Sequence, residues 1–172
     1  VDREIAATLD ALPQGTSVMV VSDHGARGMR GAVCINEWLR RAGLLALKAE
    51  PAGPRRLEPE MVDWPRTRAW GDGGYYGRVF INVKGREPEG VVAAEELDAF
   101  RATLAEAIAA IPDEHGRPLG TVVYKPEEIY RAVRGVPPDL IVYFGDLAWR
   151  SSASIGTGSI HLFENDTGPD DA

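Results

Sequence analysis

The sequence is poor in cysteine, in long apolar runs and in positive charge, and each shortage excludes a class of protein. Its 172 residues include one cysteine, Cys34, so neither a disulfide within the chain nor a cysteine-rich zinc site is possible. No apolar run approaches the roughly 20 residues that a membrane-spanning helix needs, so we expect no membrane partner. A net charge of −7 disfavours nucleic-acid binding, which usually requires a basic face.

What remains is the composition of an ordinary globular protein. Hydrophobic residues make up 44% and charged residues 26% of the chain, and its length suits one domain with its own core. The single cysteine is compatible with the reducing cytoplasm, where we expect the protein to be located. Because the sequence lacks an initiating Met and stops at Asp170-Asp171-Ala172, we expect it to be part of a longer polypeptide.

The most informative stretch is the apolar run 16–21 and the polar residues that follow it. The run is rich in β-branched residues, which predicts a buried strand of a parallel sheet. Asp23, His24 and Gly25 come directly after it, at the carboxyl edge where open α/β sheets bind ligands. An aspartate and a histidine offer the oxygen and nitrogen ligands that zinc and similar cations accept.

The same residues also allow a purely structural interpretation. Asp23 would then cap a following helix and His24 would be a surface loop residue, since two residues alone make a weak metal motif. Arg27 and Arg30 lie in the Gly- and Arg-rich segment that follows. They could face an anion or could be two solvated surface charges.

Helical and strand patterns alternate along the rest of the chain, which is typical of α/β proteins. Apolar residues spaced by three and four, from Leu97 to Ile111, predict an amphipathic helix. The proline-rich region 49–77 predicts a surface excursion or lid, and 151–172 is expected to be loop. The predicted helices cover 1–12, 36–42, 93–111 and 126–134, and the predicted strands cover 16–21, 44–47, 78–83, 121–124 and 139–144.

Polar side chains follow three of these predicted strands. The Asp-His pair follows the first, Asn82, Lys84 and Arg86 follow the second, and Asp146 follows the last. If the strands are parallel, these groups share one edge of the sheet, where the basic residues would favour phosphate or carboxylate. We therefore treat Arg27, Asn82, Lys84 and Arg86 as candidate substrate-binding residues, with solvated loop charges as the alternative.

Several strings also carry a family resemblance. Ser22-Asp23-His24-Gly25 resembles the SDHG motif of the alkaline phosphatase superfamily, especially its type I phosphodiesterase/nucleotide pyrophosphatase branch. Four longer strings resemble predicted phosphohydrolases/phosphomutases of that superfamily: INEWLRRAGLL, TRAWGDGGYYGRVFINVKGREPEG, PDLIVYFGDLAWR and FENDTGPDDA. The resemblance implies a three-layer α/β/α sandwich with a mostly parallel sheet. Residues 1–172 would form the C-terminal portion of a single catalytic domain of this kind.

The resemblance also implies a site and a reaction. The family uses two divalent metal ions, zinc or manganese, and Asp23 and His24 match two ligands of one ion. A Ser or Thr nucleophile attacks a small phosphorylated substrate and forms a covalent phospho-enzyme. Only one predicted helix and one predicted strand precede Asp23, so the nucleophile and the other ligands have no counterpart here. His161 is expected to be a strand residue, and not the family's late histidine ligand.

These inferences predict a metal-dependent phosphohydrolase whose remaining parts come from the rest of its own polypeptide. The chain alone is then expected to be inactive and to bind metal weakly, because zinc sites normally need three or four protein ligands. Two alternatives remain open. One is a phosphomutase or another transferase acting on a tetrahedral oxyanion, and the other is a non-catalytic binding module that keeps the fold.

Overall fold

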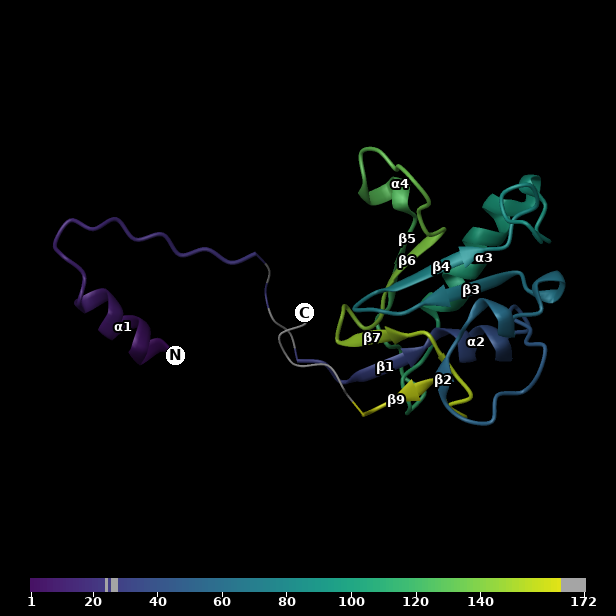
Figure 1. The fold of residues 1–172 in the computed structure, drawn as a ribbon, viewed down its shortest axis with the longest axis horizontal. Helices are drawn as coiled ribbons and strands as arrows, with labels where there is room; N and C mark the ends of the chain where they lie inside the picture. The colour runs from purple at the N-terminus through teal and green to yellow at the C-terminus, as the bar shows by residue number, and fades with distance from the viewer. Residues whose placement is uncertain (24, 26–27, 165–172) are drawn as a thin grey trace.

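The computed structural model describes residues 1–23, 25 and 28–164. These contain three β-sheets with helices beside them, and one helix, α1, lies apart from the sheets (Figure 1). The helices are α1 (Asp2–Asp10), α2 (Ile35–Arg41), α3 (Leu97–Ala109), α4 (Pro126–Ile129) and the 3-10 turns η1 (Pro59–Met61), η2 (Trp64–Arg66) and η3 (Ala94–Glu96). The strands are β1 (Gly31–Cys34), β2 (Arg55–Arg56), β3 (Ala69–Asp72), β4 (Gly77–Ile81), β5 (Val122–Tyr124), β6 (Leu140–Tyr143), β7 (Trp149–Ser152), β8 (Ser154–Ile155) and β9 (His161–Leu162). No helix in the described part is long and apolar enough to cross a membrane.

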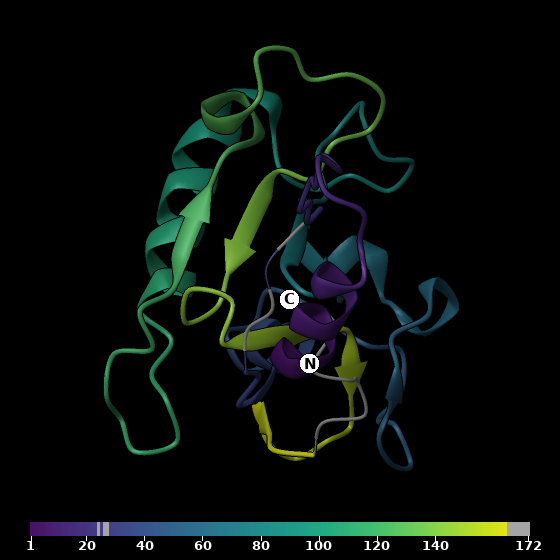
Figure 2. The ribbon, with the colours of Figure 1, turned by 90° about the vertical axis from the view of Figure 1, so that its left-hand side faces the viewer.

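The largest sheet has the strand order β3-β4-β6-β5, and all of its neighbouring strands are antiparallel. Burial alternates along β4, so that Val79 and Ile81 enter the core while their neighbours are partly exposed. The helix α3 buries Leu104 and Ile108 against this core and runs beside β5 (Figure 2). The amphipathic helix expected near 93–111 and the strands expected near 78–83, 121–124 and 139–144 are thereby confirmed.

A smaller sheet has the order β7-β1-β9, with β1 parallel to β7 and antiparallel to β9. All four residues of β1 are buried. The β1–β7 pair is the one parallel pairing among the sheets of the described residues. The mixed α/β class is therefore right, but the expected mostly parallel sheet is wrong. Parallel strands need long crossovers, whereas the short link 73–76 joins β3 and β4 as an antiparallel hairpin.

The strand expected over 16–21 is not present, because no strand of the described residues pairs with this segment. Its apolar side chains are exposed, with Met19 at 85% and Val20 at 92% of full accessibility. The preceding α1 confirms the predicted first helix but buries none of its residues. Both extend away from the sheets (Figure 1). A β-branched run forms a strand only where another strand offers hydrogen-bonding partners, and no strand of the described part of the chain does so for this segment.

Three further segments differ from their predictions. The strand predicted at 44–47 is reduced to a single bridge between Leu47 and Val62. The helix predicted over 126–134 ends at Ile129. The region 151–164, expected to be loop, holds the end of β7 and both β8 and β9. Its many serines and glycines predict loop. Ser151 and Ser152 nevertheless form part of a strand, because pairing in the β7-β1-β9 sheet buries them although they are polar.

The burial of Cys34 in β1 allows a prediction of how its thiol reacts with an alkylating reagent. The side chain is fully buried, and burial raises the pKa of the thiol above its usual value. We expect iodoacetamide to leave Cys34 unmodified at pH 8 in the folded protein and to alkylate it fully in denaturant, as followed by intact-mass spectrometry. Because the folded state holds the thiol proton more tightly, this group's stabilising contribution is lost as the pH rises above the ordinary thiol pKa. Fast alkylation without denaturant would contradict this burial.

Candidate functional site

Asp23 lies at an exposed bend immediately after the exposed apolar segment 16–21. Its predicted partner in metal binding, His24, lies outside the described residues, as does Arg27. The position of Asp23 leaves its carboxylate accessible from solvent. The predicted roles of these three residues stay predictions.

The donor types fit a divalent cation, but their number is too small. A carboxylate and an imidazole are suitable ligands for zinc or manganese. Within residues 1–23, 25 and 28–164, no three side chains from His, Cys, Asp and Glu come together as a metal site. Since protein zinc sites use at least three such ligands, the described residues do not by themselves complete one.

The side-chain amide nitrogen of Asn82 donates hydrogen bonds to backbone carbonyl groups. Its side chain is 1% exposed, and Nδ2 lies 3.1, 2.9 and 3.0 Å from the carbonyl oxygens of Trp64, Thr67 and Glu89. The amide therefore connects the η2 turn and the loop at Glu89 to the end of β4 by hydrogen bonds. Its predicted role in substrate binding stays untested, and these contacts give it a structural role.

Arg86 forms a paired ion bridge with Asp139. Its two terminal nitrogens donate to the Asp139 oxygens at 2.8 and 2.7 Å, and one of them also donates to the carbonyl of Ile81 at 2.6 Å. These hydrogen bonds raise the pKa of Arg86 above its usual value, in spite of partial desolvation. Asp139 is 5% exposed and also accepts the backbone N–H of Ile81 at 2.6 Å. The pair therefore joins the end of β4 to the start of β6.

The strand directions explain why the predicted group of polar residues does not form as expected. Because β4 and β6 are antiparallel, with Val79 opposite Leu140, the segment after β4 lies beside Asp139. Asp146 follows the other end of β6, so the expectation that it shares an edge with Arg86 is wrong. Lys84 is exposed, and its predicted role in substrate binding stays a prediction.

His161 is confirmed as a strand residue. It lies in β9 and is 9% exposed, and its Nε2 is 2.9 Å from the carbonyl oxygen of Pro112. Its ring contacts Trp149 edge to face, with 5.6 Å between the centroids. These contacts give His161 a place in the packing of the small sheet, and the expectation that it is not a metal ligand stays a prediction.

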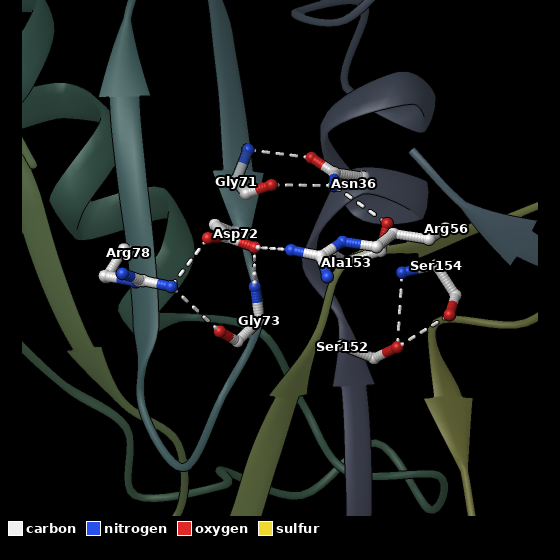
Figure 3. Close-up of polar contacts among 9 residues, drawn as sticks. All are labelled: Asn36, Arg56, Gly71, Asp72, Gly73, Arg78, Ser152, Ala153 and Ser154. Atoms are coloured by element: carbon white, nitrogen blue, oxygen red, sulfur yellow. Dashed lines mark hydrogen bonds and ion pairs between the residues drawn. The ribbon is translucent and has the colours of Figure 1, made fainter. Parts of the chain in front are cut away.

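A polar cluster around Asp72, not anticipated from the sequence, lies at the end of β3 (Figure 3). Asp72 Oδ1 accepts from Arg56 at 3.1 Å and from the backbone N–H of Gly73 at 2.9 Å, while Oδ2 accepts from Arg78 at 2.6 Å. Sequence reasoning missed this cluster because Arg56 and Asp72 both lie in the region 49–77, interpreted as a surface excursion. The only available signal was the alternation of small residues, Ala69 and Gly71, with larger ones, Trp70 and Asp72, in β3.

The comparisons with known proteins give one positive result. Neither the curated proteins nor the solved structures contain a match to this chain. The family model described as type I phosphodiesterase / nucleotide pyrophosphatase matches residues 1–170. This match includes the SDHG segment and all the described sheets. The chain therefore belongs to the type I phosphodiesterase/nucleotide pyrophosphatase family of the alkaline phosphatase superfamily.

Proposed function

We propose that this protein takes part in the hydrolysis of phosphate esters, with a small phosphorylated molecule as substrate. The observation that carries the proposal is the family match over residues 1–170. Family membership indicates a hydrolase acting on phosphate esters. The net charge of −7 favours a small substrate over nucleic acid, and the lone cysteine favours the cytoplasm as the site of action.

In this proposal Asp23 and His24 supply two ligands of one divalent ion, zinc or manganese, in a centre of two ions. The position of Asp23 at an exposed bend is compatible with such a role. A metal bound there would stabilise negative charge on the transferring phosphoryl group. The other ligands and a Ser or Thr nucleophile would come from the rest of the polypeptide. The count of ligands supports this division, since two are too few for a stable zinc site.

The exposed apolar segment 16–21 also supports a site that is completed by the rest of the polypeptide. Contiguous exposed apolar residues such as Met19 and Val20 usually mark a surface that another element covers. We propose that this segment becomes a sheet strand when it meets the rest of the polypeptide, within a three-layer α/β/α sandwich. Asp23 would then lie at the carboxyl edge of that sheet, where ligands bind.

Two other functions remain as alternatives. A phosphomutase, or another transferase acting on a tetrahedral oxyanion, would use the same donor types. A non-catalytic module that keeps the fold would bind phosphate esters without cleaving them. The test below separates this module from an enzyme.

The test compares the full-length protein, the 172-residue chain and two matched variants of the full-length protein. With p-nitrophenyl phosphate and added Zn²⁺ or Mn²⁺, we expect turnover by the full-length protein and none by the chain alone. Asp23→Asn should lower that turnover at least about tenfold, because it removes a charged ligand. The control Asp10→Asn changes another exposed aspartate, on α1, and should leave turnover unchanged. Calorimetric titration with each metal should show weak binding to the chain alone.

Two results would contradict the proposal. Turnover by the isolated chain at the full-length rate would show that no outside nucleophile is needed. An inactive full-length protein that binds phosphate esters without cleaving them would favour the binding module.

A further inference from the structure

The cluster around Asp72 holds more positive than negative charge. Asp72 is shared between Arg56 and Arg78, with N–O distances of 3.1 and 2.6 Å. One carboxylate balances only one of these two guanidinium groups. The arrangement therefore leaves excess positive charge beside the end of β3 (Figure 3).

A pocket of about 430 Å³ opens beside this cluster. Its wall includes Arg56, Asp72, Gly73 and Arg150 together with the segment 151–154. A Cβ on Gly73 would lie 2.8 Å from the carbonyl oxygen of Ser151 and 2.9 Å from the nitrogen of Ala153. Glycine is thus needed where the backbone after β3 packs closely against the end of β7 and the residue that follows it.

The pocket lies at the carboxyl end of β7, in the parallel pair β1–β7. Its wall also carries hydroxyl groups, since Ser152 donates to Ser154 Oγ at 3.0 Å and accepts the backbone N–H of Ser154 at 3.2 Å. Ser152 is buried and held in place by these contacts. Hydroxyls beside guanidinium groups are the donors that bind oxyanions in proteins.

We propose that this pocket binds a tetrahedral oxyanion of the phosphate type, with Arg56 and Ser154 as two of its donors. The side chain of Arg56 is 74% exposed, and an ion pair at such a site contributes little stability. Its guanidinium can therefore turn from Asp72 to a bound anion at small cost. Arg78 is less exposed and lies closer to Asp72, so it holds the carboxylate in place. None of these residues is a predicted metal ligand, so the inference does not depend on the proposed hydrolysis.

The test measures binding of inorganic phosphate to the 172-residue protein at constant ionic strength, by calorimetry and by amide chemical shifts. We expect saturable binding with one site and shifts centred on Gly73 and residues 151–154. Arg56→Ala should weaken the affinity at least about tenfold, since it removes a charge-assisted donor. The control Arg55→Ala removes the neighbouring arginine of β2, which does not line the pocket, and should change the affinity less than about twofold.

Two further variants distinguish a binding role from a structural one. Ser154→Ala should weaken binding without the charge change of Arg56→Ala. Asp72→Asn removes the competing carboxylate and should tighten phosphate binding at least about threefold, whereas Asp98→Asn on the exposed face of α3 should have a smaller effect. Circular dichroism checks that each variant is folded.

Each remaining outcome overturns the proposal. Absence of saturable phosphate binding would do so, and so would equal losses in Arg55→Ala and Arg56→Ala. Acetate binding as tightly as phosphate would refute the tetrahedral class of ligand. Weaker binding by a folded Asp72→Asn variant would show that the carboxylate is part of a structural network and not a competitor.

Discussion

Replacement of Asp139 by alanine lowers the free energy of unfolding by about 2 to 3 kcal/mol. The carboxylate is 5% exposed and accepts two hydrogen bonds from Arg86 and one from the backbone of Ile81. Its removal leaves the N–H of Ile81 without this acceptor and takes away two hydrogen bonds of Arg86, which keeps those to the carbonyl of Ile81 and to Glu87. Each lost hydrogen bond carries a desolvation cost. Arg86 keeps its positive charge in the variant, since an arginine guanidinium does not lose its proton in proteins, so this cost cannot be avoided by deprotonation.

Urea unfolding followed by tryptophan fluorescence measures this loss. The matched control is Asp98→Ala, which removes an exposed aspartate paired with Arg101 at 3.1 Å and should cost less than about 1 kcal/mol. Asp139→Asn keeps one acceptor and should fall between the two. Equal midpoints for Asp139→Ala and Asp98→Ala would show that the Arg86 bridge does not stabilise the fold.

Replacement of Asn36 by leucine costs about 3 to 5 kcal/mol for a related reason. Asn36 is fully buried, and its Oδ1 accepts the N–H of Gly71 at 2.8 Å. Its Nδ2 donates to the carbonyls of Gly71 at 2.9 Å and Ala153 at 3.2 Å. Leucine has a similar branched shape but leaves the N–H and the carbonyl of Gly71 unpaired, each at about 1 to 3 kcal/mol if no water reaches it. The carbonyl of Ala153 keeps the N–H of Leu57 as a partner at 3.1 Å.

The same unfolding experiment tests this variant. Gln14→Leu makes the equivalent change at an exposed amide and should alter stability by less than about 0.5 kcal/mol. Hydrogen exchange adds a local readout, because the amide of Gly71 should lose its protection in Asn36→Leu. Retained protection at Gly71 would show that water or a neighbouring group replaces the asparagine.

The parts of the fold that the sequence predicts correctly are those with local causes. The spacing of Leu104 and Ile108 and the alternation through Val79 and Ile81 are properties of one helix and one strand, and both elements form as expected. Helix capping and turn chemistry act over similarly short distances. These elements can therefore be predicted before any of their partners is known.

The errors arise where a residue's state depends on distant partners. The segment 16–21 has the composition of a strand, but no described strand pairs with it, so Met19 and Val20 are exposed. The reverse holds for Ser151 and Ser152, which are polar but buried because β1 pairs with their strand. A local sequence pattern shows which secondary structure a segment prefers. It does not show whether another strand is present to pair with that segment.

The polar contacts around the candidate site residues could not be predicted for a related reason, because they depend on the directions of the strands. The sequence places Arg86 and Asp146 after two strands, but only the antiparallel pairing of β4 with β6 decides that Arg86 meets Asp139 instead. Likewise, nothing local connects Arg56 with Asp72, since the ion pair depends on where β2 and β3 lie. The exposed bend at Asp23 is the one predicted site feature that depends on a local turn.

The pairing of β1 has a consequence for the order in which the protein folds. The hairpin β3–β4 joins neighbouring segments, whereas Ala32 of β1 pairs with Leu162 and Gly31 pairs with Trp149, both far along the sequence. Closing so large a loop lowers the entropy of the chain, and this cost arises before the strands form any hydrogen bonds with each other. The small sheet is therefore a late-forming structure, and a ribosome must release Leu162 before β1 can acquire both of its neighbours.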